Sequence, residues 1–149
     1  MRALLLAAVV AAFGGGLAPA AAGTPTVQYR TPAEVAAARA SGETGTPVVT
    51  ESDYRVLAVR RDKPGESEIH KTETDIFLVV DGKATIVVGG EMVGGREIAP
   101  GEMRGSGFKG GKDYVLDPGI VLTIPNGTPH WIRETTAGFR YVVVKTRSR

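Results

Sequence analysis

The stretch Glu68-Ile69-His70-Lys71-Thr72-Glu73-Thr74-Asp75 places one of the chain's two histidines among three carboxylates. The second histidine comes much later, at the end of Pro125-Asn126-Gly127-Thr128-Pro129-His130. Imidazole and carboxylate groups are borderline and hard ligands for divalent transition metals. Together the two segments predict a metal site.

Strand periodicity explains how the first segment can bind a metal. Side chains of a strand alternate between faces, so Glu68 and His70 point the same way. The apolar run 76–80 predicts a second strand, which Asp75 opens. A turn over 71–74 would form a hairpin and bring Asp75 back beside His70.

The Pro/Gly corner at 125–129 starts a further strand with His130, which completes the set of ligands. Four ligands on three strands suit the interior of a barrel. Glu73 is the rival to Asp75 as the fourth ligand, because a different turn would aim it inward. We interpret Glu73 instead as a solvated turn residue.

Length and composition limit the class of protein. A chain of 149 residues is one domain with room for a core. The net charge is +2 and the basic residues are scattered, so neither nucleic acid nor acidic lipid is an expected partner. The absence of cysteine excludes disulfides, thiolate ligands and cysteine nucleophiles.

The N-terminus is typical of an export signal. Met1-Arg2 is a short basic start, an apolar run follows to Phe13, and a small-residue region ends near Ala22. The apolar run is shorter than the roughly 20 residues of a membrane-spanning helix, so no stable membrane insertion is expected. We predict a signal peptide over 1–22 and a periplasmic or secreted protein.

The remainder divides into a linker with a short helix over 23–53 and a β domain over 54–149. The helix begins with a capping box, in which Thr31 is the N-cap, Pro32 the first helical residue and Glu34 the side chain that reaches back. It should end near Ser41, before a glycine. Strands are expected at 48–50, 54–61, 66–70, 75–80, 83–88, 91–93, 104–108, 112–116, 120–124, 130–134 and 138–145. Asp81-Gly82 predicts a hairpin turn. So many short strands favour an all-β sandwich or barrel.

These segments resemble the two sequence motifs of the cupins. The first motif corresponds to Glu68-x-His70-x4-Asp75-x6-Gly82. The second corresponds to Gly119-x5-Pro125-x-Gly127-x2-His130-x3-Glu134. The resemblance implies a cupin-type double-stranded β-helix, which is a jelly-roll barrel, and a divalent metal held by three histidines and one glutamate. Cupins are often dimeric, so a homodimer is among the expected partners.

The chain departs from the family pattern in its ligands. Glu68 stands where the first histidine belongs and Asp75 where the glutamate belongs, which makes Glu68, His70, Asp75 and His130 the predicted metal ligands. Two carboxylates bring a divalent cluster to about zero charge, which indicates a weaker Lewis acid and a poorer attractor of anions. The oxygen ligands favour iron or manganese, with zinc and nickel as alternatives. Glu134 shares the face of His130 by alternation, so we predict it as an acid/base residue in the cavity.

The sequence thus predicts an exported metalloprotein that acts on a small molecule, as a dioxygenase, isomerase or lyase by family likeness. The alternatives are a non-catalytic module that binds a small ligand or a metal, and a structural protein with a vestigial site. Fold likeness does not decide among them, because one fold hosts many activities.

Overall fold

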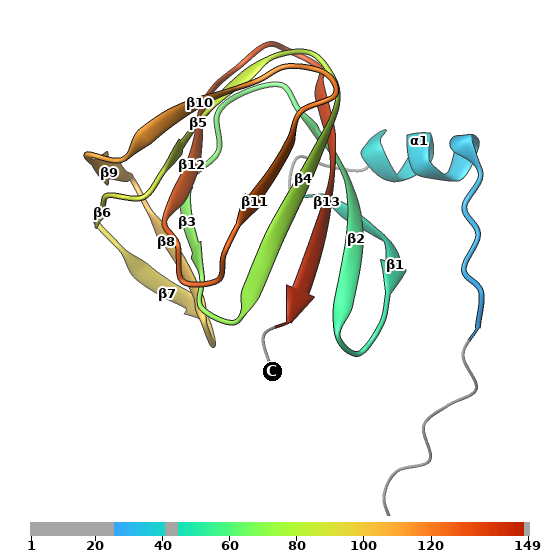
Figure 1. Cartoon of the computed structure of the whole chain (residues 1–149), viewed down its shortest axis with the longest axis horizontal. Coiled ribbons are helices and arrows are strands. Elements are labelled where there is room, and N and C mark those ends of the chain that lie inside the picture. The colour runs from blue at the N-terminus through green and yellow to red at the C-terminus, as the bar shows by residue number, and fades with distance from the viewer. Residues whose placement is uncertain (1–25, 41–44, 148–149) are drawn as a thin grey trace, which may run out of the picture.

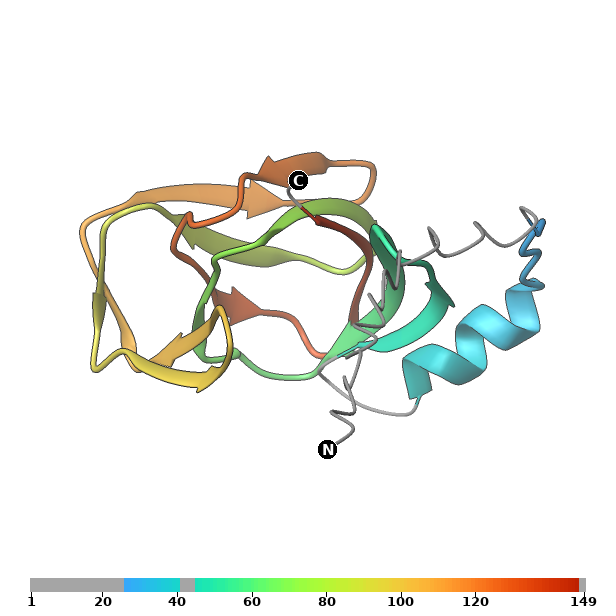
Figure 2. The same cartoon turned by 90° about the horizontal axis from the view of Figure 1, so that it is seen from below.

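The computed structural model describes residues 26–40 and 45–147, and it confirms an all-β architecture with one described helix. Two antiparallel sheets face each other and enclose the interior, as Figures 1 and 2 show. The five-stranded sheet consists, in spatial order, of β1 (Thr46–Thr50), β2 (Tyr54–Arg61), β13 (Phe139–Arg147), β4 (Glu73–Asp81) and β11 (Val121–Ile124). The six-stranded sheet consists of β10 (Lys112–Leu116), β5 (Ala84–Val88), β12 (His130–Thr135), β3 (Ser67–His70), β8 (Glu102–Gly105) and β7 (Arg96–Ala99). A separate two-stranded ribbon is made of β6 (Glu91–Val93) and β9 (Gly107–Lys109).

Helix α1 (Pro32–Ala40) lies outside the five-stranded sheet, beside β1 and β2 (Figure 1). Its capping box is confirmed: the backbone N–H of Thr31 donates to Glu34 at 2.7 Å, and that of Glu34 donates to the Thr31 hydroxyl at 3.3 Å. The predicted signal peptide over 1–22 and the predicted helix end near Ser41 lie outside the described residues. In the part of the chain that the structure describes, no helix has the length and apolar character needed to cross a bilayer.

Two predicted hairpins are wrong. Strand β3 belongs to the six-stranded sheet and β4 to the five-stranded sheet, so the turn at Lys71-Thr72 carries the chain from one sheet to the other. The turn at Asp81-Gly82 carries it back, into β5. His70 and Asp75 therefore face each other across the interior instead of along one ladder of hydrogen bonds.

The interior has a polar end and an apolar end. Along β4 the buried side chains are first Glu73 and Asp75 and then Phe77 and Val79. Strand β13 runs antiparallel to β4, and its last residues reach the polar end, where Lys145 lies directly opposite Asp75 in the register. The apolar core is formed by Leu57, Val59, Phe77, Val79, Ala84, Ile86, Leu116, Ile124, Ile132, Phe139, Tyr141 and Val143.

Gly105 of β8 has no room for a side chain. A Cβ atom there would lie 2.8 Å from the Ser67 hydroxyl, 2.7 Å from Cγ of Met92 and 2.7 Å from the Val93 carbonyl oxygen. A glycine at this position therefore lets β8 pair closely with β3.

Candidate metal centre

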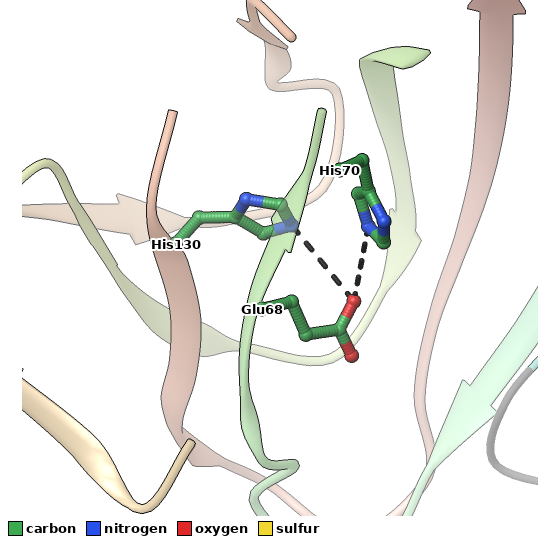
Figure 3. A group of neighbouring side chains, drawn as sticks. All are labelled: Glu68, His70 and His130. Atoms are coloured by element: carbon green, nitrogen blue, oxygen red, sulfur yellow. Dashed lines mark ion pairs between the residues drawn. The ribbon is translucent and has the colours of Figure 1, made fainter. Parts of the chain in front are cut away.

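Glu68, His70 and His130 bring their ligand atoms together between the two sheets, as predicted (Figure 3). Oε2 of Glu68 lies 3.2 Å from Nε2 of His70 and 3.9 Å from Nε2 of His130. Within the described residues, these three side chains form the group whose potential ligand atoms all lie within 4.8 Å of one another. Alternation along β3 places Glu68 and His70 on one face, and the β12 register places His130 opposite Glu68.

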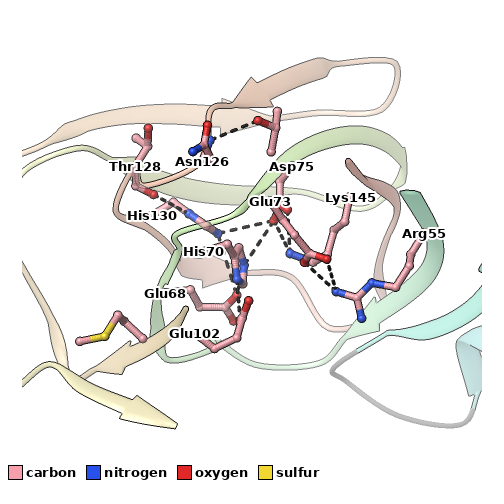
Figure 4. A network of polar contacts seen from close by, with 12 residues as sticks. Arg55, Glu68, His70, Glu73, Asp75, Glu102, Asn126, Thr128, His130 and Lys145 are labelled. Carbon is pink, nitrogen blue, oxygen red and sulfur yellow. Dashed lines mark hydrogen bonds and ion pairs between the residues drawn. The ribbon is translucent and has the colours of Figure 1, made fainter. Parts of the chain in front are cut away.

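Asp75 lies at the edge of this group. Its Oδ2 is 3.5 Å from Nε2 of His70 and 3.7 Å from Nε2 of His130. Both of its oxygens accept hydrogen bonds from Nζ of Lys145, at 2.7 and 2.8 Å (Figure 4). Asp75 is thus in the predicted place, but a buried ammonium group already neutralises it.

The outer nitrogens of both imidazoles bond to oxygen atoms. Nδ1 of His70 lies 2.7 Å from Oε2 of Glu102, and Nδ1 of His130 lies 3.1 Å from the Thr128 carbonyl oxygen. A carbonyl or an ionised carboxylate can only accept, so each Nδ1 carries the proton. The lone pair of each neutral imidazole is therefore on Nε2, which faces Glu68.

Glu73 is buried, so its interpretation as a solvated turn residue is wrong. Only 7% of its side chain is exposed. Both carboxylate oxygens accept hydrogen bonds from Nη2 of Arg55, at 2.8 and 2.6 Å, and Figure 4 shows this pair beside Lys145. Glu73 on β4 is thus held by Arg55 on β2 of the same sheet.

Two further arginines flank Glu68. Nη2 of Arg61 lies 3.9 Å from its Oε1, and Nη2 of Arg104 lies 3.8 Å from its Oε2. Arg104 reaches Glu68 because β8 pairs with β3 and places the two residues opposite each other. The same register places Glu102 opposite His70.

The pKa values follow from these contacts. Burial opposes ionisation of Glu68, but contact with His70 and the charges of His130 and Arg104 outweigh it and lower the pKa to about 2. Burial also lowers the pKa of His130, which favours the neutral imidazole that binds metals. For His70, burial is again the largest effect and lowers the pKa, but the contact with Glu68 and the negative charges of Asp75 and Glu68 together outweigh it and raise the pKa. A metal therefore competes with a proton for Nε2 of His70 more strongly than for Nε2 of His130.

The cluster opens into a cavity of about 950 Å³. Its walls include the ligand candidates, the arginines Arg61 and Arg104, and apolar side chains such as Phe77 and Ile132. A cavity of this size accommodates a small organic molecule.

Comparison with known proteins identifies the fold. No profile of a protein family matches the sequence, and no curated protein is similar enough to count as a match. Among solved structures, KdgF from Halomonas sp. is similar, with 17% identity and a TM-score of 0.51 over 70% of this chain and 79% of that one. A conserved Klebsiella pneumoniae protein with a double-stranded β-helix domain is similar over 72% of this chain and 79% of its own, with 17% identity and a TM-score of 0.51. The chain has the cupin fold.

Another cupin-fold neighbour is the hydroquinone 1,2-dioxygenase PnpCD, solved in complex with Cd²⁺ and 4-hydroxybenzonitrile. It shares 15% identity, with a TM-score of 0.53 over 76% of this chain and 69% of that one. The predicted fold class and cupin resemblance are confirmed, and the cupin barrel of this chain carries a candidate His/Glu metal site.

The expected position of Glu134 in the cupin cavity is wrong. A β-bulge between Ile132 and Glu134 resets the alternation on β12 after Ile132 has turned inward. The Glu134 side chain is 66% exposed and lies 3.6 Å from Nε of Arg133. It is not among the residues that line the cavity, so we drop it as an acid/base candidate.

Sequence reasoning missed Glu102 and Lys145 as members of this cupin site. Glu102 lies in a glycine-rich region whose strand pairing is not visible in the sequence. Lys145 had a usable signal, because it continues the inward alternation of Tyr141 and Val143 on β13.

Proposed function

We propose that this cupin-fold protein binds a divalent metal through Glu68, His70 and His130 and acts on a small organic molecule in the adjoining cavity. One observation supports this above all others: each histidine has its Nδ1 on an oxygen acceptor and its Nε2 toward the same carboxylate. Metal-binding histidines are held in this way, with the outer nitrogen donating to a carboxylate or carbonyl group.

The donor set fits a metal ion. Nε2 of His70 is buried and makes no hydrogen bond of good geometry, although Oε2 of Glu68 is 3.2 Å away. Two electron-rich atoms facing each other at this distance require a cation between them, either a proton or a metal. Two histidines and one carboxylate, with positions left open, form the ligand set of non-haem iron(II) oxygenases. Iron and manganese are therefore favoured, with zinc and nickel as alternatives.

A bound metal of this kind would supply Lewis-acid chemistry or, for iron, oxygen chemistry. The chain itself contributes position and charge: Glu102 fixes the His70 ring, and Lys145 keeps Asp75 from acting as a free base. We retain dioxygenase, isomerase and lyase activities as the candidate reactions. The fold neighbour PnpCD, a dioxygenase obtained with Cd²⁺, supports the first of these as far as a shared fold can.

Elemental analysis tests the metal. The protein is purified without added metal, and iron, manganese, nickel and zinc are measured against protein concentration. We expect close to one equivalent of one of them, and a large loss in His130→Asn. Absence of metal from the wild-type protein, together with failure to take up Fe²⁺, Mn²⁺, Ni²⁺ or Zn²⁺ in dialysis, would refute the proposal.

A second candidate function is a non-catalytic module that binds a small ligand or a metal. The observation in its favour is that Glu73 and Asp75, two buried carboxylates in the same cavity, are already paired with Arg55 and Lys145. Neither is therefore available to move a proton. Oxygen uptake and product analysis with a panel of phenols, thiols and diketones separate the two candidates, because the module binds without turnover.

Export, domain division and assembly stay predictions of the sequence. We propose cleavage after Ala22 in a periplasmic or secreted protein. The sequence placed the domain boundary at residue 53, but β1 (Thr46–Thr50) already pairs with β2 in the barrel sheet, so we propose that the barrel begins with β1. Intact-mass measurement of the protein from the extracytoplasmic fraction tests the cleavage. Light scattering tests the homodimer.

A further inference from the structure

We propose that Arg39, Arg60 and Arg140 form a binding site for the phosphate group of a small soluble molecule. The site lies on the outside of the barrel, in a pocket of about 470 Å³ between α1 and the five-stranded sheet. The described residues that line the cavity of the candidate metal centre include none of these three arginines. The site therefore goes beyond the proposed function and does not depend on a metal.

The three guanidinium groups come from three separate elements. Arg60 on β2 and Arg140 on β13 lie directly opposite each other in the register, and like charges in such a cross-strand pair destabilise a sheet. Helix α1 lies beside β2 and adds Arg39, from its last turn, to the same pocket (Figure 1). Ala36 and Ala40 of the same helix also line the pocket, and their small side chains fill little of it.

Arg39 is the member of this group that lacks an acidic partner. Its Nε is buried and makes no hydrogen bond, and no acidic group pairs with it among the residues that the structure describes. Nε of Arg55 and of Arg133 is also buried without a hydrogen bond, but these arginines bond to Glu73 and Asp113 through Nη2. A buried polar group without a partner calls for an explanation such as a bound ion.

Charge favours an anion in this pocket. Burial, which is the larger effect, and the positive charge of Arg140 both lower the pKa of Arg39. Arginine nevertheless stays ionised in proteins, so the three cations exceed their two acidic neighbours, Asp62 and Asp81, by one charge. The partial negative charge of about half an elementary charge at the end of α1 reduces this excess without cancelling it. A bound anion would offset the remainder.

An anion does not have to break an ion pair in order to bind. Arg60 donates to Oδ1 of Asp62 through Nη2, at 2.9 Å, and Arg140 donates to Oδ2 of Asp81 through Nη2. Each guanidinium group carries five N–H donors, so both arginines keep further donors beside these bonds. Their side chains are 50% and 45% exposed, so a ligand from solution can reach them.

The arrangement favours a phosphate group over a carboxylate. The donors come from a helix and two strands, and a tetrahedral phosphate group has three terminal oxygens to accept from them, whereas a carboxylate has two in one plane. A phosphate monoester also carries a charge of about −1.5 to −2 at pH 7, which is more than that of one carboxylate.

Titration calorimetry with inorganic phosphate tests the site, in EDTA to exclude binding to a metal and at constant ionic strength to hold screening fixed. We expect Arg39→Met to weaken phosphate binding about tenfold, the effect of one lost hydrogen bond to a charged group. Methionine is about as good a helix former as arginine, so α1 should stay folded. The matched control is Arg96→Met, which removes the same charge from β7, where the side chain is 60% exposed and pairs with Glu66; it should leave the affinity unchanged.

Thermal unfolding separates phosphate binding from a purely structural role of Arg39 at the end of α1. Phosphate should raise the Tm of wild type and of Arg96→Met, but not that of Arg39→Met. A Tm that Arg39→Met lowers equally with and without phosphate would show a structural role alone and overturn the proposal.

Three binding results would also overturn the proposal. The first is equal phosphate affinity of wild type and Arg39→Met. The second is acetate that binds as tightly as phosphate at the same ionic strength. The third is binding to phosphatidylglycerol vesicles without binding to inorganic phosphate, which would assign the pocket to a membrane surface.

Discussion

Replacing Lys145 by methionine should make the stability of the barrel depend on metal. The Lys145 ammonium bonds both oxygens of Asp75, and the two side chains are 12% and 3% exposed. Removing one partner of a buried ion pair leaves an uncompensated charge and costs about 3–5 kcal/mol. We expect Lys145→Met to lose about 3 kcal/mol of unfolding free energy in the metal-free protein.

A metal should restore most of that loss. Asp75 lies 3.5 and 3.7 Å from the Nε2 atoms of His70 and His130, so once freed from Lys145 it is placed to become a fourth ligand. Because each 1.4 kcal/mol corresponds to a factor of ten, recovery of about 3 kcal/mol implies roughly 100-fold tighter metal binding than in wild type.

Urea unfolding with EDTA or with Mn²⁺ measures the stability, and calorimetry measures the Mn²⁺ affinity. The matched control is Asp75→Asn combined with Lys145→Met, which removes both charges. This double variant should cost little without metal and gain no affinity with it. If Lys145→Met loses the same free energy with and without Mn²⁺ and binds Mn²⁺ no more tightly than wild type, Asp75 does not belong to the metal centre.

Two further variants test the groups around the ligands. Glu102→Gln removes the charged acceptor on Nδ1 of His70 and should weaken metal affinity about 10–100-fold, measured by competition with a chelator. Glu97→Gln, on a side chain that is 49% exposed, is the control and should leave the affinity unchanged; equal effects of the two variants would contradict the role of Glu102. Arg55→Met should leave Glu73 buried without its partner and lower the free energy of unfolding, measured in urea, by about 1–3 kcal/mol. This range is below that of a fully buried ion pair because the Arg55 side chain is 34% exposed. Unchanged stability would show that Glu73 finds another partner.

The sequence predicted those features of the site that depend on local periodicity. Alternation on one short strand was enough to place Glu68 and His70 on the same face. The Pro/Gly corner correctly predicted that β12 begins at His130. The bulge after Ile132 broke the same rule, since one extra residue redirects every side chain that follows it, and Glu134 was misplaced.

The pairing of strands could not be predicted from the local sequence pattern. Asp81-Gly82 is a turn in both the predicted hairpin and the observed crossing, and only the packing of the two sheets decides between them. The partners of His70 and Asp75 were missed for the same reason. Glu102 and Lys145 reach them through the pairings of β8 with β3 and of β13 with β4, which join segments distant in the sequence.

The lack of a side chain at Gly105 fixes the position of β8, and with it the positions of the two site residues on this strand. Strand β8 carries both Glu102, the carboxylate that orients the His70 imidazole, and Arg104, the guanidinium group beside Glu68. Any side chain at Gly105 would wedge this strand away from its neighbour. A substitution at Gly105, which is not among the candidate ligands, would therefore displace Glu102 and Arg104 together and would have the same effect as a mutation in the metal site.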